Sequence, residues 1–216
     1  MLLLFLSTLV SAGYYGVDYS DAVSVSSLSC FKSSGFGDMV IIRGWEEIYN
    51  VFDANAVQNL KNAYTAGYTQ SQIDMYFEPC FGCGNLDVQL NDFWNLVKSN
   101  NMKFNKLWIS LEVFVTHSLK TDVEELTSLL DKANALGINY GLLTSYSDIA
   151  SFYGFTLKNP ESVQLWWYNI DNQPNYDEYD KDKIHYIGWH PEKPAMKLYS
   201  KNMKLCNVVV NYDYKE

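Results

Sequence analysis

The stretch Met39-Val40-Ile41-Ile42-Arg43 is an almost unbroken apolar run that ends in a charged residue. A strand that is apolar on both faces has to be buried on both faces, which is typical of a parallel sheet covered by helices. Similar short runs recur along the chain, at residues 14–18, 73–77, 107–111, 140–144, 165–168, 195–199 and 208–210. The sequence therefore offers eight candidate strands within 216 residues.

Helical patterns lie between the earlier strand candidates. Val57, Leu60 and Ala63 repeat at helical spacing, and similar apolar faces occur within residues 86–97 and 121–133. Strands that alternate with helices predict parallel pairing through right-handed crossovers. The predicted fold class is α/β, a (β/α) barrel of the TIM type in which some helices of the second half are short or missing. An open doubly wound sheet is the alternative, but no glycine-rich loop follows the first strand.

The first twelve residues, MLLLFLSTLVSA, predict a cleaved signal peptide, because a short apolar run precedes small residues. The run is too short to span a bilayer. No linker or repeat divides the rest, so residues 13–216 are expected to form one domain. The protein is expected outside the cell, or in a phagosomal or lysosomal lumen.

The net charge of −9 excludes some partners. An acidic surface without a basic stripe repels nucleic acid and anionic membranes, so neither is expected as a partner after signal cleavage. The 17 Tyr and 6 Trp are mostly core residues, although flat aromatic rings also suit sugar binding. A monomer is expected.

Four cysteines, Cys30, Cys80, Cys83 and Cys206, are expected to form disulfides in a secreted protein. Three pairings are possible, and local closure of Cys80 with Cys83, leaving Cys30 for Cys206, is preferred. A redox pair at 80–83 is disfavoured because it does not begin a helix of a thioredoxin-like unit. Half a zinc site is the other alternative, but the three His show no ligand spacing, so no metal or cofactor is expected.

In such barrels the functional residues gather at the carboxyl ends of the strands. Charged and aromatic residues at these positions are Asp18, Arg43, Trp45, Glu78, Glu112, Tyr168 and Asp171. Glu112 follows the apolar run 107–111, and a buried carboxylate costs free energy unless it is paired or functional. Carboxylates at several strand ends suit glycoside hydrolysis, which needs a proton donor and a group that supports an oxocarbenium-like centre.

Each candidate also has a structural explanation. Asp18 could cap a turn near Ser20, and Glu78 and Asp171 could be solvated loop charges. Residues 177–182 form an acidic run that is typical of a surface loop rather than a metal site. Four aromatic residues could form walls for sugar rings, namely Trp45, Trp166, Trp167 and Tyr168.

Several of these segments, in one order over nearly the whole mature chain, resemble glycoside hydrolase family 25, and its nematode and amoeba-type branch in particular. The segments are GVDYS at 16–20, VIIRG at 40–44, IDMYFEPCFGC at 73–83, LWISLE at 107–112, LWWY at 165–168, and AMKLY at 195–199 with Cys206. Members of this family are lysozymes that cut the bond between muramic acid and glucosamine in peptidoglycan. The resemblance also supports the preferred disulfide pairing.

The resemblance implies roles for individual residues. The family carries an Asp on the first strand, an Asp-x-Glu on the fourth and another Asp near the end of the chain. Asp18 matches the first and Glu112 the general acid, whereas Ser110 replaces the Asp beside it and the last acid falls near Asn202. The expected catalytic residues are Glu112 and Asp18. The expected substrate-binding residues are Arg43, Trp45, Tyr76, Glu78, Ser110, Trp167, Tyr168 and Asn202.

The resemblance thus implies a secreted lysozyme that acts on bacterial peptidoglycan. Because Ser110 cannot act as an anion, activity is expected to be weak or shifted to acid pH. The alternative is a lysozyme-like protein that binds peptidoglycan or a similar glycan without cutting it.

Overall fold

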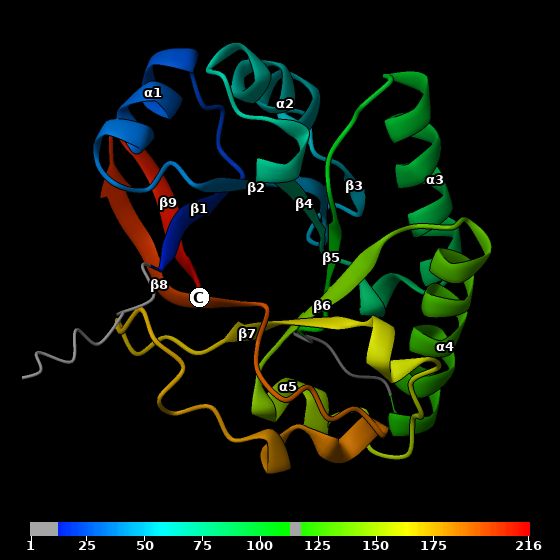
Figure 1. Cartoon of the computed structure of the whole chain (residues 1–216). Coiled ribbons are helices and arrows are strands. Elements are labelled where there is room, and N and C mark those ends of the chain that lie inside the picture. The colour runs from blue at the N-terminus through cyan, green and yellow to red at the C-terminus, as the bar shows by residue number, and fades with distance from the viewer. Residues whose placement is uncertain (1–12, 113–117) are drawn as a thin grey trace, which may run out of the picture.

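The computed structural model describes residues 13–112 and 118–216, so the predicted signal peptide lies outside the described residues. Eight strands close into a barrel, and a short ninth strand extends the sheet beside β2 (Figure 1). The barrel strands in spatial order are β1 (Tyr14–Tyr19), β2 (Met39–Glu46), β4 (Ile73–Phe77), β5 (Leu107–Ser110), β6 (Tyr140–Thr144), β7 (Gln164–Tyr168), β8 (Met196–Leu205) and β9 (Val208–Lys215). The predicted α/β barrel is confirmed.

The last strand differs from the expected parallel arrangement. Within the barrel, the neighbouring strands from β1 through β8 pair in parallel, but β9 pairs antiparallel with both β8 and β1; the short β3 outside the barrel also pairs antiparallel, with β2. Only Cys206 and Asn207 join β8 to β9, and both adopt a positive φ (53° and 64°). A two-residue connection allows a hairpin but is too short for a parallel crossover. The expectation of parallel pairing is therefore wrong for β9.

Long helices cover only the first half of the barrel (Figure 1). These are α1 (Val25–Ser33), α2 (Ala56–Thr65), α3 (Leu86–Ser99) and α4 (Leu119–Ala135). After β6 the only α-helix of the described chain is the short α5 (Tyr146–Ala150), and the connection from β7 to β8 contains 3₁₀ turns instead of an α-helix. The prediction that helices of the second half are short or missing is confirmed.

Helix α1 was not expected from the sequence. It is rich in serine, and its buried residues are only Leu28 and Phe31, so its apolar periodicity is weak. Its start is nevertheless well defined, because the Ser24 side chain accepts a hydrogen bond from the Ser27 amide.

The inside of the barrel is a packed core rather than a pore. The inward-facing apolar residues are Met39, Ile41, Tyr76, Trp108, Leu143, Trp166, Met196 and Leu198. Gly141 makes room for Trp108, because a Cβ there would lie 2.4 Å from its ring. The interior therefore has no room for a ligand, and we call the end of the barrel formed by the carboxyl ends of the parallel strands the mouth.

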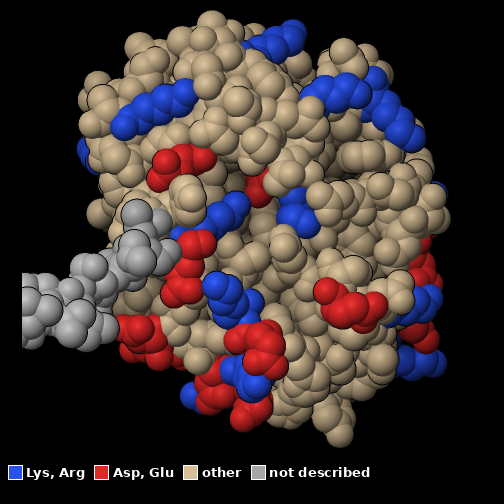
Figure 2. All heavy atoms as spheres, viewed as in Figure 1, with Lys and Arg blue, Asp and Glu red and all other residues tan. Residues whose placement is uncertain are grey.

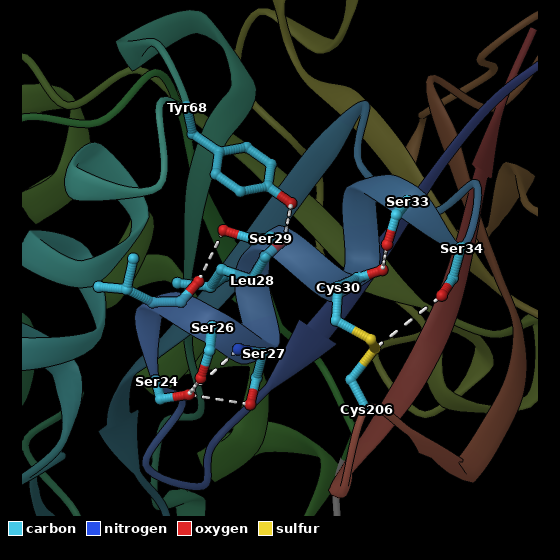
Figure 3. The surroundings of a disulfide bond; sticks show 11 residues. Ser24, Ser26, Ser27, Leu28, Ser29, Cys30, Ser33, Ser34, Tyr68 and Cys206 are labelled. Carbon is cyan, nitrogen blue, oxygen red and sulfur yellow. Dashed lines mark hydrogen bonds between the residues drawn. A yellow bond between two sulfur atoms is a disulfide. The ribbon is translucent and has the colours of Figure 1, made fainter.

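Two disulfides join the cysteines in the preferred pairing, which is confirmed. Cys30 on α1 is bonded to Cys206 in the β8–β9 turn, across 176 residues of sequence (Figure 3). A crosslink that closes so long a loop strongly restricts the unfolded chain. The hairpin that lacks a covering helix is thus tied to the helical half of the barrel.

The outer surface carries both signs of charge. On the face seen in Figure 2, acidic and basic side chains are interspersed, and the described basic groups form no stripe. Among the described helices, none is long and apolar enough to cross a membrane.

Candidate active site

Glu112 lies at the mouth, directly after β5. The Leu111 amide donates to the Leu143 carbonyl at 2.9 Å, which continues the pairing of β5 with β6 up to this point. The Glu112 side chain is 18% exposed, and its Oε1 lies 3.2 Å from Nζ of Lys201. The carboxylate predicted to donate a proton is therefore half-buried and ion-paired.

Lys201 was not expected in the site. It lies on β8, in a stretch where the pairing with β9 shifts register. Besides its contact with Glu112, its Nζ lies 4.2 Å from the centre of the Tyr168 ring. Its charge also lowers the pKa of Asp18. One ammonium group thus interacts with both predicted catalytic acids and with Tyr168.

Asp18 is buried at the mouth end of β1. Its Oδ1 accepts a hydrogen bond of 2.8 Å from the Asn211 amide on β9. Burial raises the pKa of Asp18 to about 6, the Asn211 bond and the Lys201 charge oppose the rise, and the charge of Glu112 adds to it. Asp18 and Glu112 therefore lie close enough to influence each other.

A second buried acid, Asp213 on β9, lies beside Asp18. The pairing of Gly16 with Asp213 and of Asp18 with Asn211 puts both acids on the inner side of the barrel. Asp213 Oδ1 accepts a hydrogen bond of 2.9 Å from Trp166 Nε1, and its carboxyl group also hydrogen-bonds that of Asp18. Burial, and then the charge of Asp18, raises the pKa of Asp213 well above its usual range. We infer that Asp213 holds the proton of this pair.

Asn202 is exposed in the β8–β9 hairpin. The resemblance to the family places the last acid of the family near this residue. Its backbone amide donates to Asn211 Oδ1 at 3.0 Å, and Asn211 in turn contacts Asp18. Asn202 thus orients a neighbour of the site through its backbone, while Asp213 is the acid from this end of the chain that contacts Asp18.

Glu78 lies at the mouth after β4 and is not a solvated loop charge. Its side chain is 28% exposed, and burial raises its pKa to about 8. Arg43, 3.6 Å away, opposes this rise, whereas the charges of Glu112, Asp18 and Glu47 add to it. Glu78 is therefore mainly protonated at neutral pH.

Arg43 is held in place by three carboxylates. Its Nε lies 2.7 Å from Asp53 Oδ2, and its terminal nitrogens lie 3.5 Å from Glu46 and 3.6 Å from Glu78. Beside it, Tyr76 is buried inside the barrel with its ring edge-on to Trp166. Both residues support the floor of the mouth.

Ser110, at the position of the missing family acid, is buried. Its Oγ accepts a hydrogen bond of 3.3 Å from the Glu112 amide. It thus helps to hold the backbone at Glu112 but supplies no charge.

Only one of the four aromatic candidates faces the mouth with substantial exposure. Tyr168 is half-buried there beneath Lys201. Trp45 is turned outward, where it packs on Phe77 and donates to Asn50. Trp166 is fully buried inside the barrel, and Trp167 is 1% exposed among outer aromatic rings. Tyr168 is therefore the candidate wall for a sugar ring.

An open groove of about 520 Å³ begins at Glu112 and runs over the ends of β6 and β7. Its lining residues are Glu112, Ser145, Tyr146, Ser147, Asp148, Trp167, Tyr168, Asn169 and Ile170. Asp171, just beyond it, contacts the buried Lys197 at 2.5 Å. Asp171 therefore anchors the loop after β7 and is not a free loop charge.

The arrangement suits acid–base chemistry carried by side chains. Within residues 13–112 and 118–216, no group of three or more His, Cys, Asp or Glu side chains is arranged to hold a metal ion. The mouth instead combines the ion-paired Glu112 with three acids, Asp18, Glu78 and Asp213, whose pKa values are raised to different extents. Such differences are typical of sites that transfer protons.

Comparisons with known proteins agree with this geometry. A family profile described as "Lysozyme-like protein 1" matches residues 10–199. The chain is 28% identical to the probable GH family 25 lysozyme 5 of Dictyostelium discoideum, over 99% of this chain and 97% of that protein. It is 29% identical to lysozyme-like protein 5 of Caenorhabditis elegans, over 99% and 96%.

The fold is also similar to solved structures. A family GH25 lysozyme from Aspergillus fumigatus superposes with a TM-score of 0.69, at 13% identity, over 95% of this chain and 94% of that chain. A muramidase from Trichobolus zukalii gives a TM-score of 0.67, at 14% identity, over 94% and 93%. At such identities the likeness concerns the fold alone.

Proposed function

The chain belongs to the lysozyme-like protein 1 family, and from this we propose that it is a secreted muramidase that acts on bacterial peptidoglycan. The bond it cuts is the β-1,4 bond between N-acetylmuramic acid and N-acetylglucosamine. The proposed secretion is supported by the stretch MLLLFLSTLVSA at residues 1–12, a short apolar run before small residues as in a signal peptide. The observation that carries the proposal is that Glu112 and Asp18 lie at one barrel mouth, Glu112 3.2 Å from Lys201 and Asp18 2.8 Å from Asn211, and that the charges of Lys201 and Glu112 both act on Asp18.

In the proposed reaction, Glu112 gives a proton to the glycosidic oxygen while the bond from that oxygen to the sugar C1 breaks. The acetamido oxygen of the same sugar bonds to C1 and forms a positively charged ring. Asp18, held by Asn211, supports this charge as an anion. Water then attacks C1, the ring reopens, and a proton returns to Glu112.

Two features predict that activity is weak. Ser110 supplies no negative charge next to Glu112, and the Lys201 ammonium lies 3.2 Å from the Glu112 carboxylate. A cation at this place opposes the positive charge that develops on the sugar. Before Glu112 can act as an acid, its carboxylate also has to give up the contact with Lys201 and take up a proton.

The same two features favour a second candidate, a protein that binds peptidoglycan without cutting it. The groove and Tyr168 would then serve recognition alone. Both candidates use the same mouth, so they differ only in whether a bond is broken.

Cell-wall clearing and release of reducing ends, measured from about pH 3 to 8, separate the two. We expect slow clearing by the wild type and a loss of at least about 100-fold in Glu112→Gln. Glu124→Gln is the matched control, because Glu124 is 68% exposed on α4 and forms an ion pair with Lys120 on the same helix.

Equal clearing by Glu112→Gln and wild type would disprove the role of Glu112. Binding to insoluble wall by the wild type, without released ends at any pH, would support the binding protein instead.

A further inference from the structure

A short hairpin stands beside the mouth, and the residues at its tip take no part in the site described above. It joins β2 to β3 (Val51–Phe52), which pair antiparallel through Trp45 with Phe52 and Glu46 with Val51. At its tip, Ile48 is 80% exposed and Tyr49 is 73% exposed. Two neighbouring large apolar side chains so exposed at the rim of a candidate site are a feature of binding surfaces.

Although its tip is exposed, the hairpin is well anchored. The Asn50 amide donates to the Glu47 carbonyl at 3.1 Å, and Asn50 adopts the positive φ of 51° that such a turn requires. Trp45 Nε1 donates to Asn50 Oδ1 at 3.2 Å, and the Asp53 amide donates to the Gly44 carbonyl at 3.0 Å. Because the backbone is already ordered, binding through Tyr49 would cost little conformational entropy.

The hairpin lies within electrostatic reach of the mouth. Burial raises the pKa of Glu47, in the hairpin, to about 6, and the charge of Glu112 adds to the rise. The charge of Glu47 in turn adds to the raised pKa of Glu78. The hairpin is therefore continuous with the site rather than a separate surface.

The order of strands sets the hairpin and the groove on opposite sides of Glu112. Around the barrel, β4 separates β5 from β2, which carries the hairpin. In the other direction, β6 separates β5 from β7, which carries Tyr168 and the groove. A linear polymer that lies in the groove and passes over Glu112 continues toward the side of the barrel that carries the β2–β3 hairpin (strand order in Figure 1).

We propose that Ile48 and Tyr49 form a second glycan-binding subsite, which takes sugars of a linear β-1,4-linked amino-sugar strand on the far side of Glu112 from the groove. This inference rests on the proposed function, because it assumes a glycan in the mouth. The Tyr49 ring offers a flat face for the C–H groups of a sugar, and Ile48 an apolar contact for an acetamido methyl group. The subsite favours long strands, since a disaccharide in the groove does not reach it.

Binding affinity tests the subsite without requiring catalysis. All variants are made in the Glu112→Gln background, and two probes are compared by calorimetry or fluorescence: soluble uncrosslinked glycan strands and the N-acetylglucosaminyl-N-acetylmuramic acid disaccharide. Tyr49→Ala is expected to bind strands about tenfold more weakly and the disaccharide unchanged. Tyr49→Trp, which keeps a flat ring, is expected to bind strands as tightly as the parent.

Tyr14→Ala is the matched control, because Tyr14 is 56% exposed at the start of β1, the end of the barrel away from the mouth. It should leave both affinities unchanged. Strand binding by Tyr49→Ala equal to that of the parent would overturn the subsite, as would an equal loss of disaccharide binding. If the wild type cuts no glycan but Tyr49→Ala still weakens strand binding, the subsite stands and the enzymatic proposal fails.

Discussion

The mouth contains two pairs of acids with opposite surroundings. The inner pair, Asp18 and Asp213, is buried, and its members contact each other and neutral donors, Asn211 and Trp166. The outer pair, Glu78 and Glu112, is partly exposed, and each member lies beside a cation, Arg43 or Lys201. Negative charge is thus held without a directly bound counterion in the inner pair. In the outer pair, protonation removes the charge of Glu78 and Lys201 balances that of Glu112.

This difference indicates which acid can supply the negative charge that stabilises a positively charged sugar. The outer pair is neutralised, because Glu78 is mainly protonated at neutral pH and Glu112 contacts Lys201. Ser110 adds no charge beside them. If Asp213 holds the proton of the inner pair, Asp18 carries the remaining negative charge. We therefore expect catalysis to depend more heavily on Asp18 here than in a mouth with a further acid at 110.

The largest expected effect comes from removing that charge. Asp18→Asn should reduce the rate of glycan cleavage by about 100- to 1000-fold, which is typical for the loss of one electrostatic support. It should not destabilise the fold at pH 8. The raised pKa of Asp18, about 6, means that ionisation above this pH opposes folding, and the neutral amide lacks this cost.

Cleavage rates and melting temperatures at pH 8 test this together. A lower rate with an equal or higher melting temperature supports the role of Asp18. A fall in both would mean that Asp18 serves mainly to hold β1 against β9, and an unchanged rate would contradict the comparison between the two pairs.

A smaller effect, in the opposite direction, is expected from restoring charge to the outer pair. Ser110→Asp should raise the cleavage rate about tenfold, because an anion beside Glu112 supports the positive sugar and offers Lys201 a second partner. Ser110→Asn is the control, since it has nearly the same size without the charge. A gain in the Asp variant but not in the Asn variant is the expected result. No gain in either variant would contradict the expectation that the lack of a negative charge at position 110 limits the rate.

Much of this site could be predicted from the sequence, because its residues follow the predicted strands. The residues that were not predicted were missed for physical reasons. Glu112, Asp18, Glu78 and Arg43 follow apolar runs, so the barrel rule found them. Lys201 and Asp213 were missed because β8 and β9 extend beyond the runs 195–199 and 208–210 into polar residues. The pair Cys206-Asn207 between the two strands was the available signal for a hairpin.

The aromatic residues show how side-chain direction limits such predictions. Trp45 would face inward by alternation from Arg43, but the strand register shifts between these residues, so Trp45 turns outward. Trp167 faces away from the barrel interior, as alternation along β7 predicts once Tyr168 faces the mouth, although Trp167 still lines the groove. A register shift leaves no clear mark in the sequence, whereas alternation does.

The smallest expected effect concerns the pH dependence of stability. The pKa of Glu78, about 8, lies above its ordinary value of 4.5, so between these values the folded protein holds a proton that the unfolded chain has lost. Stability from this group is therefore present below about pH 4.5 and is lost as the pH rises through 8. Between about pH 7 and 9, Asp18 and Glu47, with pKa values of about 6, are already mainly ionised, so Glu78 dominates among these acids.

Over this interval the wild type should lose about 1 kcal/mol of unfolding free energy that Glu78→Gln does not lose. Denaturant unfolding at several pH values measures the two slopes, and Glu124→Gln, on the exposed face of α4, should follow the wild type. Parallel curves for Glu78→Gln and wild type would mean that Arg43 keeps Glu78 ionised throughout. The outer pair would then carry more negative charge than we infer from the raised pKa of Glu78. Catalysis would in that case depend less on the charge of Asp18.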